Sequence, residues 1–131
     1  MANTSKLNFI VIDDSKLDCF IAEKMIRNTG MCESIISFFQ ATEALEYITK
    51  TTGTPEFHTI LLVDIQMPVM NGFEFVEAFE KLPADITQHY TIYIITSSIN
   101  ENDLKRVRNY SSVKQFLNKP LTSNNLAILI S

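Results

Sequence analysis

Five short runs of apolar residues alternate with amphipathic segments along the chain, and this alternation constrains the fold more than any other feature. Such an order is typical of parallel strands that are connected by helices. Two of the runs, 60–63 and 92–95, are apolar throughout rather than at every second residue, which suits strands buried on both faces. The predicted strands are 7–12, 34–39, 59–63, 91–95 and 113–117.

The segments between and after these runs predict helices. In the first helix we expect Leu17, Ile21 and Met25 to form the stripe that packs on the sheet, and Gly30 is placed to stop that helix. Pro83 is expected to close the third helix. Five strands and five helices predict a three-layer, doubly wound α/β domain. The first predicted helix begins at 15 or 16 and ends at 28. The other four cover 42–51, 72–82, 102–110 and 123–130.

The length and composition exclude several classes of protein. With 131 residues we expect a single domain over residues 1–131, without an output domain. The net charge is −4 and no run of Lys and Arg exceeds two residues, which argues against direct binding of nucleic acid. No apolar run is long enough for a signal peptide or a membrane span. Cys19 and Cys32 lack metal-site spacing, so we expect two free, at least half-buried thiols in a cytoplasmic protein.

Polar and charged residues directly follow four of the five predicted strands. Because the carboxyl ends of parallel strands meet at one edge of a sheet, these side chains are expected to converge on one crevice. Each residue alone has an ordinary explanation, such as a helix cap at Asp13, Asp14 or Ser15. The complete set is what indicates a site. Its members are Asp13, Asp14, Asp64, Thr96, Ser97, Ser98, Lys119 and Pro120.

Three carboxylates in one crevice require a compensating charge. At an effective dielectric constant near 20, two carboxylates about 5 Å apart repel by roughly 3 kcal/mol. A hard divalent cation offsets this repulsion, and Mg²⁺ is commonly held by carboxylates, waters and phosphate oxygens. Lys119 adds a fixed positive charge, and the hydroxyl of Thr96 can donate to a phosphoryl oxygen. The set is therefore equipped to carry a phosphoryl group on a carboxylate.

Four motifs match a known family in the right order. They are Ile-Asp-Asp-Ser at 12–15, Val-Asp-Ile-Gln-Met-Pro-Val-Met-Asn-Gly at 63–72, Ile-Thr-Ser-Ser at 95–98 and Phe-Leu-Asn-Lys-Pro-Leu at 116–121. Over nearly its whole length the chain resembles the receiver domain of two-component response regulators, in particular the single-domain chemotaxis regulator. The resemblance implies a flavodoxin-like topology for the five-stranded sheet.

The resemblance also assigns a role to each matching residue. Asp64 would be the phosphoacceptor, and Asp13, Asp14, Asp64 and the backbone carbonyl of Gln66 would hold Mg²⁺. Lys119 would contact the phosphoryl group.

Four further residues receive structural or switching roles from the resemblance. The Lys119–Pro120 peptide bond would be cis, which only an X–Pro step forms at low cost. Pro68 and Gly72 would shape the loop before the third helix. Phe116 would be the aromatic switch residue that swings inward when the strand-4 hydroxyl moves toward the phosphoryl group.

The identity of the switch hydroxyl is open between two neighbours. Ser97 lies 22 residues before Lys119, the spacing that is commoner in the family, and Thr96 lies 23 before it. We favour Thr96, since it directly follows the apolar strand and leaves a small residue beside the site. An extra residue within 109–114 would explain the spacing.

Several alternatives accompany this interpretation. A phosphatase of the haloacid-dehalogenase type would need a second Asp where Gln66 stands, and a flavodoxin-like carrier of FMN would not place Asp13 and Asp14 in its phosphate loop. His58 and His89 precede strands, away from the site, and are expected to be incidental.

Within the family, the expected donor is a sensor histidine kinase or a histidine phosphotransfer protein, and the expected output is through an unidentified downstream protein. We expect a phosphoacceptor that promotes its own phosphorylation and dephosphorylation rather than an enzyme that turns over an external substrate. A phosphoryl shuttle in a multi-step relay and a receiver used only for docking are the alternatives.

Overall fold

The computed structural model describes residues 6–51, 53–98 and 100–130. Within these ranges, five parallel strands form one sheet with the order β2-β1-β3-β4-β5. This order is that of the flavodoxin-like doubly wound fold, as predicted. The strands are β1 (Leu7–Ile12), β2 (Cys32–Phe38), β3 (Thr59–Asp64), β4 (Tyr90–Thr96) and β5 (Val113–Asn118). The helices are α1 (Lys16–Asn28), α2 (Ala41–Lys50), α3 (Gly72–Glu80), α4 (Ala84–Thr87), α5 (Glu101–Val107) and α6 (Ser123–Ile130).

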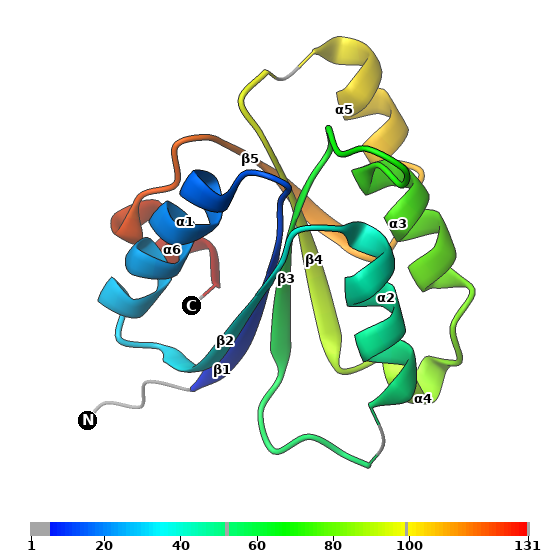
Figure 1. Ribbon diagram of the computed structural model, residues 1–131, viewed down its shortest axis with the longest axis horizontal. Coiled ribbons are helices and arrows are strands. Elements are labelled where there is room, and N and C mark those ends of the chain that lie inside the picture. The colour runs from blue at the N-terminus through cyan, green and yellow to red at the C-terminus, as the bar shows by residue number, and fades with distance from the viewer. Residues whose placement is uncertain (1–5, 52, 99, 131) are drawn as a thin grey trace.

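Helices cover both faces of the sheet, which gives the three layers that the sequence predicts. Figure 1 shows α1 and α6 on one side of the strands and α2, α3, α4 and α5 on the other. Each face has its own apolar core. Phe9, Val11 and Leu62 point toward α1 and α6, while Ile10, Leu61 and Val63 point toward α2 and α3. The strictly alternating direction of side chains along a strand therefore decides which helix layer each residue contacts.

The first helix begins where the sequence predicts but buries a different face. The side chain of Ser15 accepts a hydrogen bond from the backbone N–H of Asp18 at 3.1 Å and caps the helix. The buried residues of α1 are Cys19, Ala22 and Ile26. The predicted stripe is wrong at Leu17, which is 66% exposed. The buried stripe of α1 runs through residues 19, 22 and 26, and Leu17 lies outside it.

The segment after α3 contains a helix that the sequence analysis missed. The third helix ends at Glu80 rather than at 82, and Pro83 then begins the single-turn helix α4 instead of only closing α3. Pro83 directly precedes α4, and its carbonyl accepts hydrogen bonds from the backbone N–H groups of Ile86 and Thr87. The pattern of apolar residues does not indicate this helix, because α4 has only four residues and none of them is buried.

Both thiols match the prediction, because Cys19 is buried, Cys32 is half-buried and neither forms a disulfide. No helix in the described part of the chain is long and apolar enough to cross a membrane.

Candidate functional site

The site lies at the point where the strand order reverses. The chain runs from β1 outward to β2 on one side and to β3 on the other, so the carboxyl ends of β1 and β3 flank a crevice. Asp13 and Asp14 directly follow β1, and Asp64 is the last residue of β3. One carboxylate oxygen from each of these three residues lies within 4.8 Å of the others. Asp13 and Asp64 are buried and Asp14 is exposed, so the cluster has one side open to solvent.

Three contacts fix the position of Asp13. Its Oδ1 accepts a hydrogen bond from the backbone N–H of Ser15 at 3.0 Å, and its backbone carbonyl accepts one from Sγ of Cys19 at 3.3 Å. Its Oδ2 pairs with Nζ of Lys119 at 2.7 Å. Burial raises the pKa of the Cys19 thiol to about 11, so this thiol stays protonated and able to donate. Asp13 is therefore held rigidly at the base of the site.

Lys119 reaches the cluster from the end of β5. Its backbone N–H donates to the carbonyl of Thr96 at 2.8 Å, which ties the ends of β4 and β5 together. Its Nζ lies 3.7 Å from Oδ1 of Asp64 and also hydrogen-bonds Oδ2 of Asp18 at 2.9 Å. The hydrogen bonds to Asp13 and Asp18 raise the pKa of Lys119 above its usual value, although burial alone would lower it. The lysine therefore remains a cation inside the site.

Asp18 is a charged residue of the site that the sequence analysis did not find. It lies in the first turn of α1, and its backbone amide is bound by the capping side chain of Ser15. The three-residue spacing from a capping serine could have placed Asp18 at the start of the helix, beside the strand ends. The pairing with Lys119 could not be read from the sequence, because 101 residues separate the two.

The electrostatic environment raises the affinity of Asp64 for a proton. Burial raises the pKa of Asp64 to about 6, and the nearby carboxylates of Asp13 and Asp14 act in the same direction, while Lys119 opposes them. Without a further positive charge, ionising Asp64 beside the other two carboxylates thus costs free energy.

The loop between β3 and α3 is closed tightly under Asp64. The N–H of Gly72 donates to the carbonyl of Ile65 at 2.9 Å, and a Cβ at position 72 would lie 2.5 Å from the backbone oxygen of Asp64. Only glycine allows this approach. Asn71 and Glu74 form a reciprocal capping box that begins α3. Gly72 and this cap together place the end of β3 against the start of α3.

Val69, in the same loop, has an unusual backbone conformation. Its φ is 70°, in the left-handed region that a β-branched residue rarely adopts. Its side chain is 86% exposed. The backbone N–H of Met70 donates to the carbonyl of Pro68 at 2.8 Å, so the chain turns tightly at Val69, and no buried packing of its side chain compensates for the strain.

The two candidate hydroxyls differ in their surroundings. Thr96 is buried, and its Oγ1 accepts a hydrogen bond from the backbone N–H of Ser98 at 3.2 Å. Ser97 is exposed and lines a cavity of about 260 Å³ together with Asp13, Asp18 and Lys119. In this structure Thr96 is turned to its own loop rather than to the carboxylates.

The pairing of β4 with β5 is irregular near the start of β5. Ile92 pairs with Val113 but Tyr93 pairs with Gln115, so Lys114 is an additional residue in β5. This residue lies within the segment 109–114, where the spacing argument expects an insertion. The choice of Thr96 over Ser97 stays a prediction.

The remaining predicted residues surround the cluster. Gln66 is exposed in the β3–α3 loop, two residues after Asp64. Phe116 is half-buried on β5 and packs against the core on the α3 and α5 side. The Lys119–Pro120 peptide bond is cis, as the resemblance implies.

The carboxylate cluster fits a magnesium ion. Mg²⁺ prefers oxygen ligands at about 2.0–2.1 Å, so oxygens on opposite sides of the ion lie roughly 4 Å apart. The three carboxylate oxygens fall within 4.8 Å of one another and need only a small adjustment. One side is open to solvent through Asp14, as an ion that keeps several waters requires.

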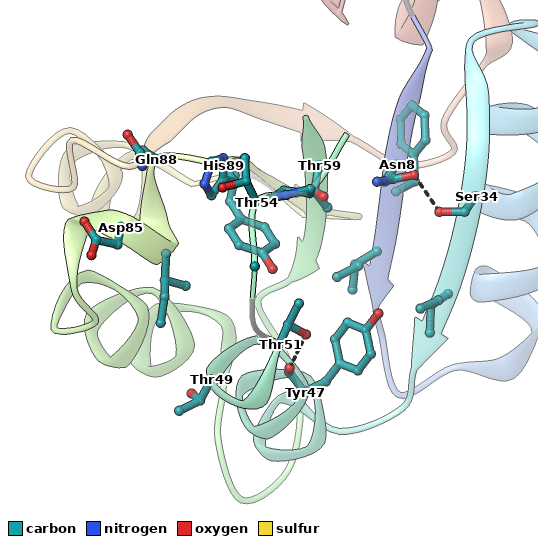
Figure 2. Close-up of a pocket in the computed structure, with 17 residues that line it drawn as sticks. Asn8, Ser34, Tyr47, Thr49, Thr51, Thr54, Thr59, Asp85, Gln88 and His89 are labelled. Atoms are coloured by element: carbon teal, nitrogen blue, oxygen red, sulfur yellow. Dashed lines mark hydrogen bonds between the residues drawn. The ribbon is translucent and has the colours of Figure 1, made fainter. Parts of the chain in front are cut away.

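A cavity of about 610 Å³ lies at the opposite edge of the sheet (Figure 2). It is lined by residues at the amino ends of strands, among them Asn8, Thr59 and Tyr90. His89 lies in this cavity, and Nε2 of His58 is 2.7 Å from Oγ1 of Thr91. Both histidines are therefore far from the carboxylate cluster, as the sequence analysis expects.

Comparisons with known proteins agree with this geometry. The family model of the response regulator receiver domain matches residues 9–131. A crystal structure of a response regulator receiver protein from Dyadobacter fermentans has a TM-score of 0.85 and 30% identity, and the match covers 95% of this chain and 94% of that one.

Two curated relatives differ greatly in length. The Two-component response regulator 24 of Arabidopsis thaliana is 24% identical over 96% of this chain and 83% of its own length. The Sensor histidine kinase CheAY of Helicobacter pylori is 26% identical over 92% of this chain, which spans only 14% of that protein.

Proposed function

The chain belongs to the response regulator receiver domain family, and from this premise we propose that Asp64 accepts a phosphoryl group and that the resulting aspartyl phosphate changes the surface that a partner protein recognises. The observation that carries the proposal is the convergence of Asp13, Asp14, Asp64 and Lys119 at one edge of the sheet.

The transfer is a displacement at phosphorus. An oxygen of the ionised Asp64 carboxylate forms a bond to the phosphorus of a phosphohistidine, and the bond between phosphorus and the donor's imidazole nitrogen breaks. The electron pair of that bond stays on the imidazole. Such transfers depend on positioning and on neutralising the equatorial oxygens. Lys119 supplies a positive charge 3.7 Å from the nucleophilic carboxylate.

Magnesium would be held by Asp13, Asp14 and Asp64, with the backbone carbonyl of Gln66 as a further ligand. When bound, the ion supplies positive charge that neutralises both the carboxylates and the oxygens of the phosphoryl group. The residues of the chain do the remaining work. Lys119 keeps Asp13 paired, and the buried contacts of Asp13 keep the base of the site rigid.

The switch follows from the new hydrogen-bond acceptors on Asp64. A phosphoryl oxygen offers the Thr96 hydroxyl a stronger acceptor than the backbone carbonyl of Ser98, to which the hydroxyl now donates at 3.3 Å. Movement of this hydroxyl vacates space beside Phe116, which is half-buried and neighbours Ile94 across the β4–β5 pair. Phosphorylation thereby stabilises a conformation that is otherwise minor.

The partners are proposed from the family and from the surface. A sensor histidine kinase or a histidine phosphotransfer protein donates the phosphoryl group. The face of α5, β5 and α6 receives the downstream protein, and Phe116, Leu121 and Leu129 line a cavity of about 260 Å³ there. A shuttle in a multi-step relay uses the same chemistry, so it remains the second candidate. A docking-only receiver is disfavoured because no acidic residue or lysine of the site is missing.

The test uses a small donor, because the receiver supplies most of the chemistry itself. The protein is incubated with acetyl phosphate and Mg²⁺, and its intact mass is recorded. We expect a single phosphoryl adduct that is absent when EDTA replaces Mg²⁺ and absent in Asp64→Asn. An adduct of equal yield in Asp64→Asn would refute the assignment.

A further inference from the structure

The ammonium group of Lys119 is shared between two carboxylates that have different environments. Its Nζ lies 2.7 Å from Oδ2 of Asp13 and 2.9 Å from Oδ2 of Asp18. The side chain of Asp13 is 1% exposed, whereas that of Asp18 is 37% exposed. Asp18 thus approaches the lysine from the solvent side, and Asp13 approaches it from the base of the site.

The two carboxylates also differ in what else they can bind. Asp13 belongs to the group of three whose oxygens lie within 4.8 Å of one another, and Asp18 is not in that group among the described residues. When a metal ion draws on the oxygens of Asp13, that residue becomes a weaker partner for Lys119. Asp18 keeps its full charge for the lysine.

The position of Asp18 is fixed by the start of α1. Its backbone N–H donates to Oγ of Ser15, and the backbone N–H of Ser15 donates to Asp13. This chain of contacts links the helix cap to the base of the site. The carboxylate of Asp18 is therefore held at the edge where the strands end, rather than on a freely moving surface side chain.

We propose that Asp18 is a positioning residue for phosphoryl transfer, which holds the ammonium of Lys119 beside Asp64 when Asp13 is engaged by the metal ion. The proposal rests on the proposed function of the site. An ammonium group has three N–H donors on a flexible four-carbon stem. Asp13 and Asp18 accept two of these, and the third is free to reach an oxygen on Asp64, whose Oδ1 is 3.7 Å away. Fixing the lysine in advance lowers the cost of ordering it during transfer.

A purely electrostatic role and a positioning role of Asp18 predict opposite changes in the phosphorylation rate when its carboxylate is removed. Acetyl phosphate is an anion, so the loss of a nearby negative charge by itself would speed the reaction. Loss of positioning would slow it. The rate of phosphorylation in Asp18→Asn therefore separates a positioning role from a bystander charge.

The experiment measures the rate of formation of the phosphoryl adduct by intact mass, with Mg²⁺ at a concentration shown to be saturating for each variant. We expect Asp18→Asn to react about tenfold more slowly than the unmodified protein. In the Lys119→Ala background, the same substitution should change the rate by less than about twofold, because the group that it positions is gone.

Matched variants separate this effect from damage to the fold. Asp85→Asn makes the same change in α4, at the opposite edge of the sheet, and should leave the rate unchanged. Asp18→Glu keeps the charge and should recover most of the rate. If Asp18→Asn fails to fold by far-UV circular dichroism, Asp18→Ser tests the loss of the carboxylate with a residue that suits a first helical turn.

Two results would overturn the proposal. One is an Asp18→Asn rate equal to or faster than that of the unmodified protein. The other is an equal slowing by Asp18→Asn in the presence and absence of Lys119. Failure of the proposed function looks different, because the unmodified protein would then form no adduct at all.

Discussion

Oδ1 of Asp64 lies 3.7 Å from Nζ of Lys119, close enough for an ion pair and too far for a hydrogen bond. Lys119 instead hydrogen-bonds two other carboxylates. The ammonium of Lys119 therefore offsets only part of what raises the pKa of Asp64. Burial, followed by the charge of Asp13, raises this pKa to about 6 although a cation lies nearby. In the unphosphorylated site without a metal ion, the ionised form of Asp64 is therefore destabilised.

This relationship predicts a pH-dependent gain in stability from Asp64→Asn. In the folded protein Asp64 binds its proton below about pH 6, and in the unfolded chain only below about 3.8. The contribution of Asp64 to stability is thus fully present below pH 3.8 and is lost as the pH rises through 6. At pH 7.5 without Mg²⁺, the neutral amide should raise the free energy of unfolding by up to about 3 kcal/mol. Urea titrations of both proteins at pH 7.5 and pH 4 test this, and an equal difference at the two pH values contradicts it.

Magnesium should stabilise the fold through the same carboxylates. A ligand that binds only the folded state at a hundred times its Kd adds about 2.7 kcal/mol. We expect Mg²⁺ to raise the melting temperature of the unmodified protein and to have a much smaller effect on Asp14→Asn. Asp14 is exposed, so its substitution should leave the fold intact. Thermal unfolding with and without Mg²⁺ measures the effect, with Asp85→Asn as the control. An equal shift in all three proteins would place the ion elsewhere.

The two neighbouring hydroxyls are expected to respond differently. Thr96→Ala should still accept a phosphoryl group but lose the conformational response, since its hydroxyl is the one that moves from Ser98 to the phosphoryl group. Ser97→Ala should keep both. Amide hydrogen exchange in β5, with and without beryllofluoride as a phosphoryl mimic, reports the response. A loss confined to Ser97→Ala would reverse the assignment.

The left-handed conformation of Val69 predicts a stabilising substitution. Left-handed φ costs an L-residue about 1–2 kcal/mol, and asparagine tolerates it better than valine. Because the Val69 side chain is 86% exposed, little packing is lost on replacement. We expect Val69→Asn to raise the free energy of unfolding by about 1 kcal/mol in urea titrations. Val69→Ala keeps the Cβ and serves as the control. Equal stability of these two variants would show that the strain is not stored at this residue.

The sequence predicts the edge that carries the carboxylate cluster well, because the position of these residues depends on where the strands end. Once the apolar runs are taken as parallel strands, the residues after them must meet, and Asp13, Asp14 and Asp64 do so within 4.8 Å. The strand bounds differ from those predicted by at most two residues, as at β2, which begins at Cys32 although Glu33 is charged. An edge strand tolerates such a residue because one side faces solvent.

The features that the sequence analysis missed depend on how helices are rotated or paired. Helical spacing alone predicts that Leu17 faces inward, but α1 is rotated so that it buries Cys19, Ala22 and Ile26 instead. The same rotation turns Asp18 toward Lys119. Long-range pairings of this kind are set by tertiary packing, which no local pattern encodes.

The most direct test of the central claim locates the phosphoryl group in the chain. After incubation with acetyl phosphate and Mg²⁺, borohydride reduction converts an aspartyl phosphate to homoserine, and peptide mass mapping finds the altered residue. We expect homoserine at position 64 alone, with none after incubation in EDTA. Modification at Asp13, at Asp14 or at a hydroxyl in place of Asp64 would contradict it.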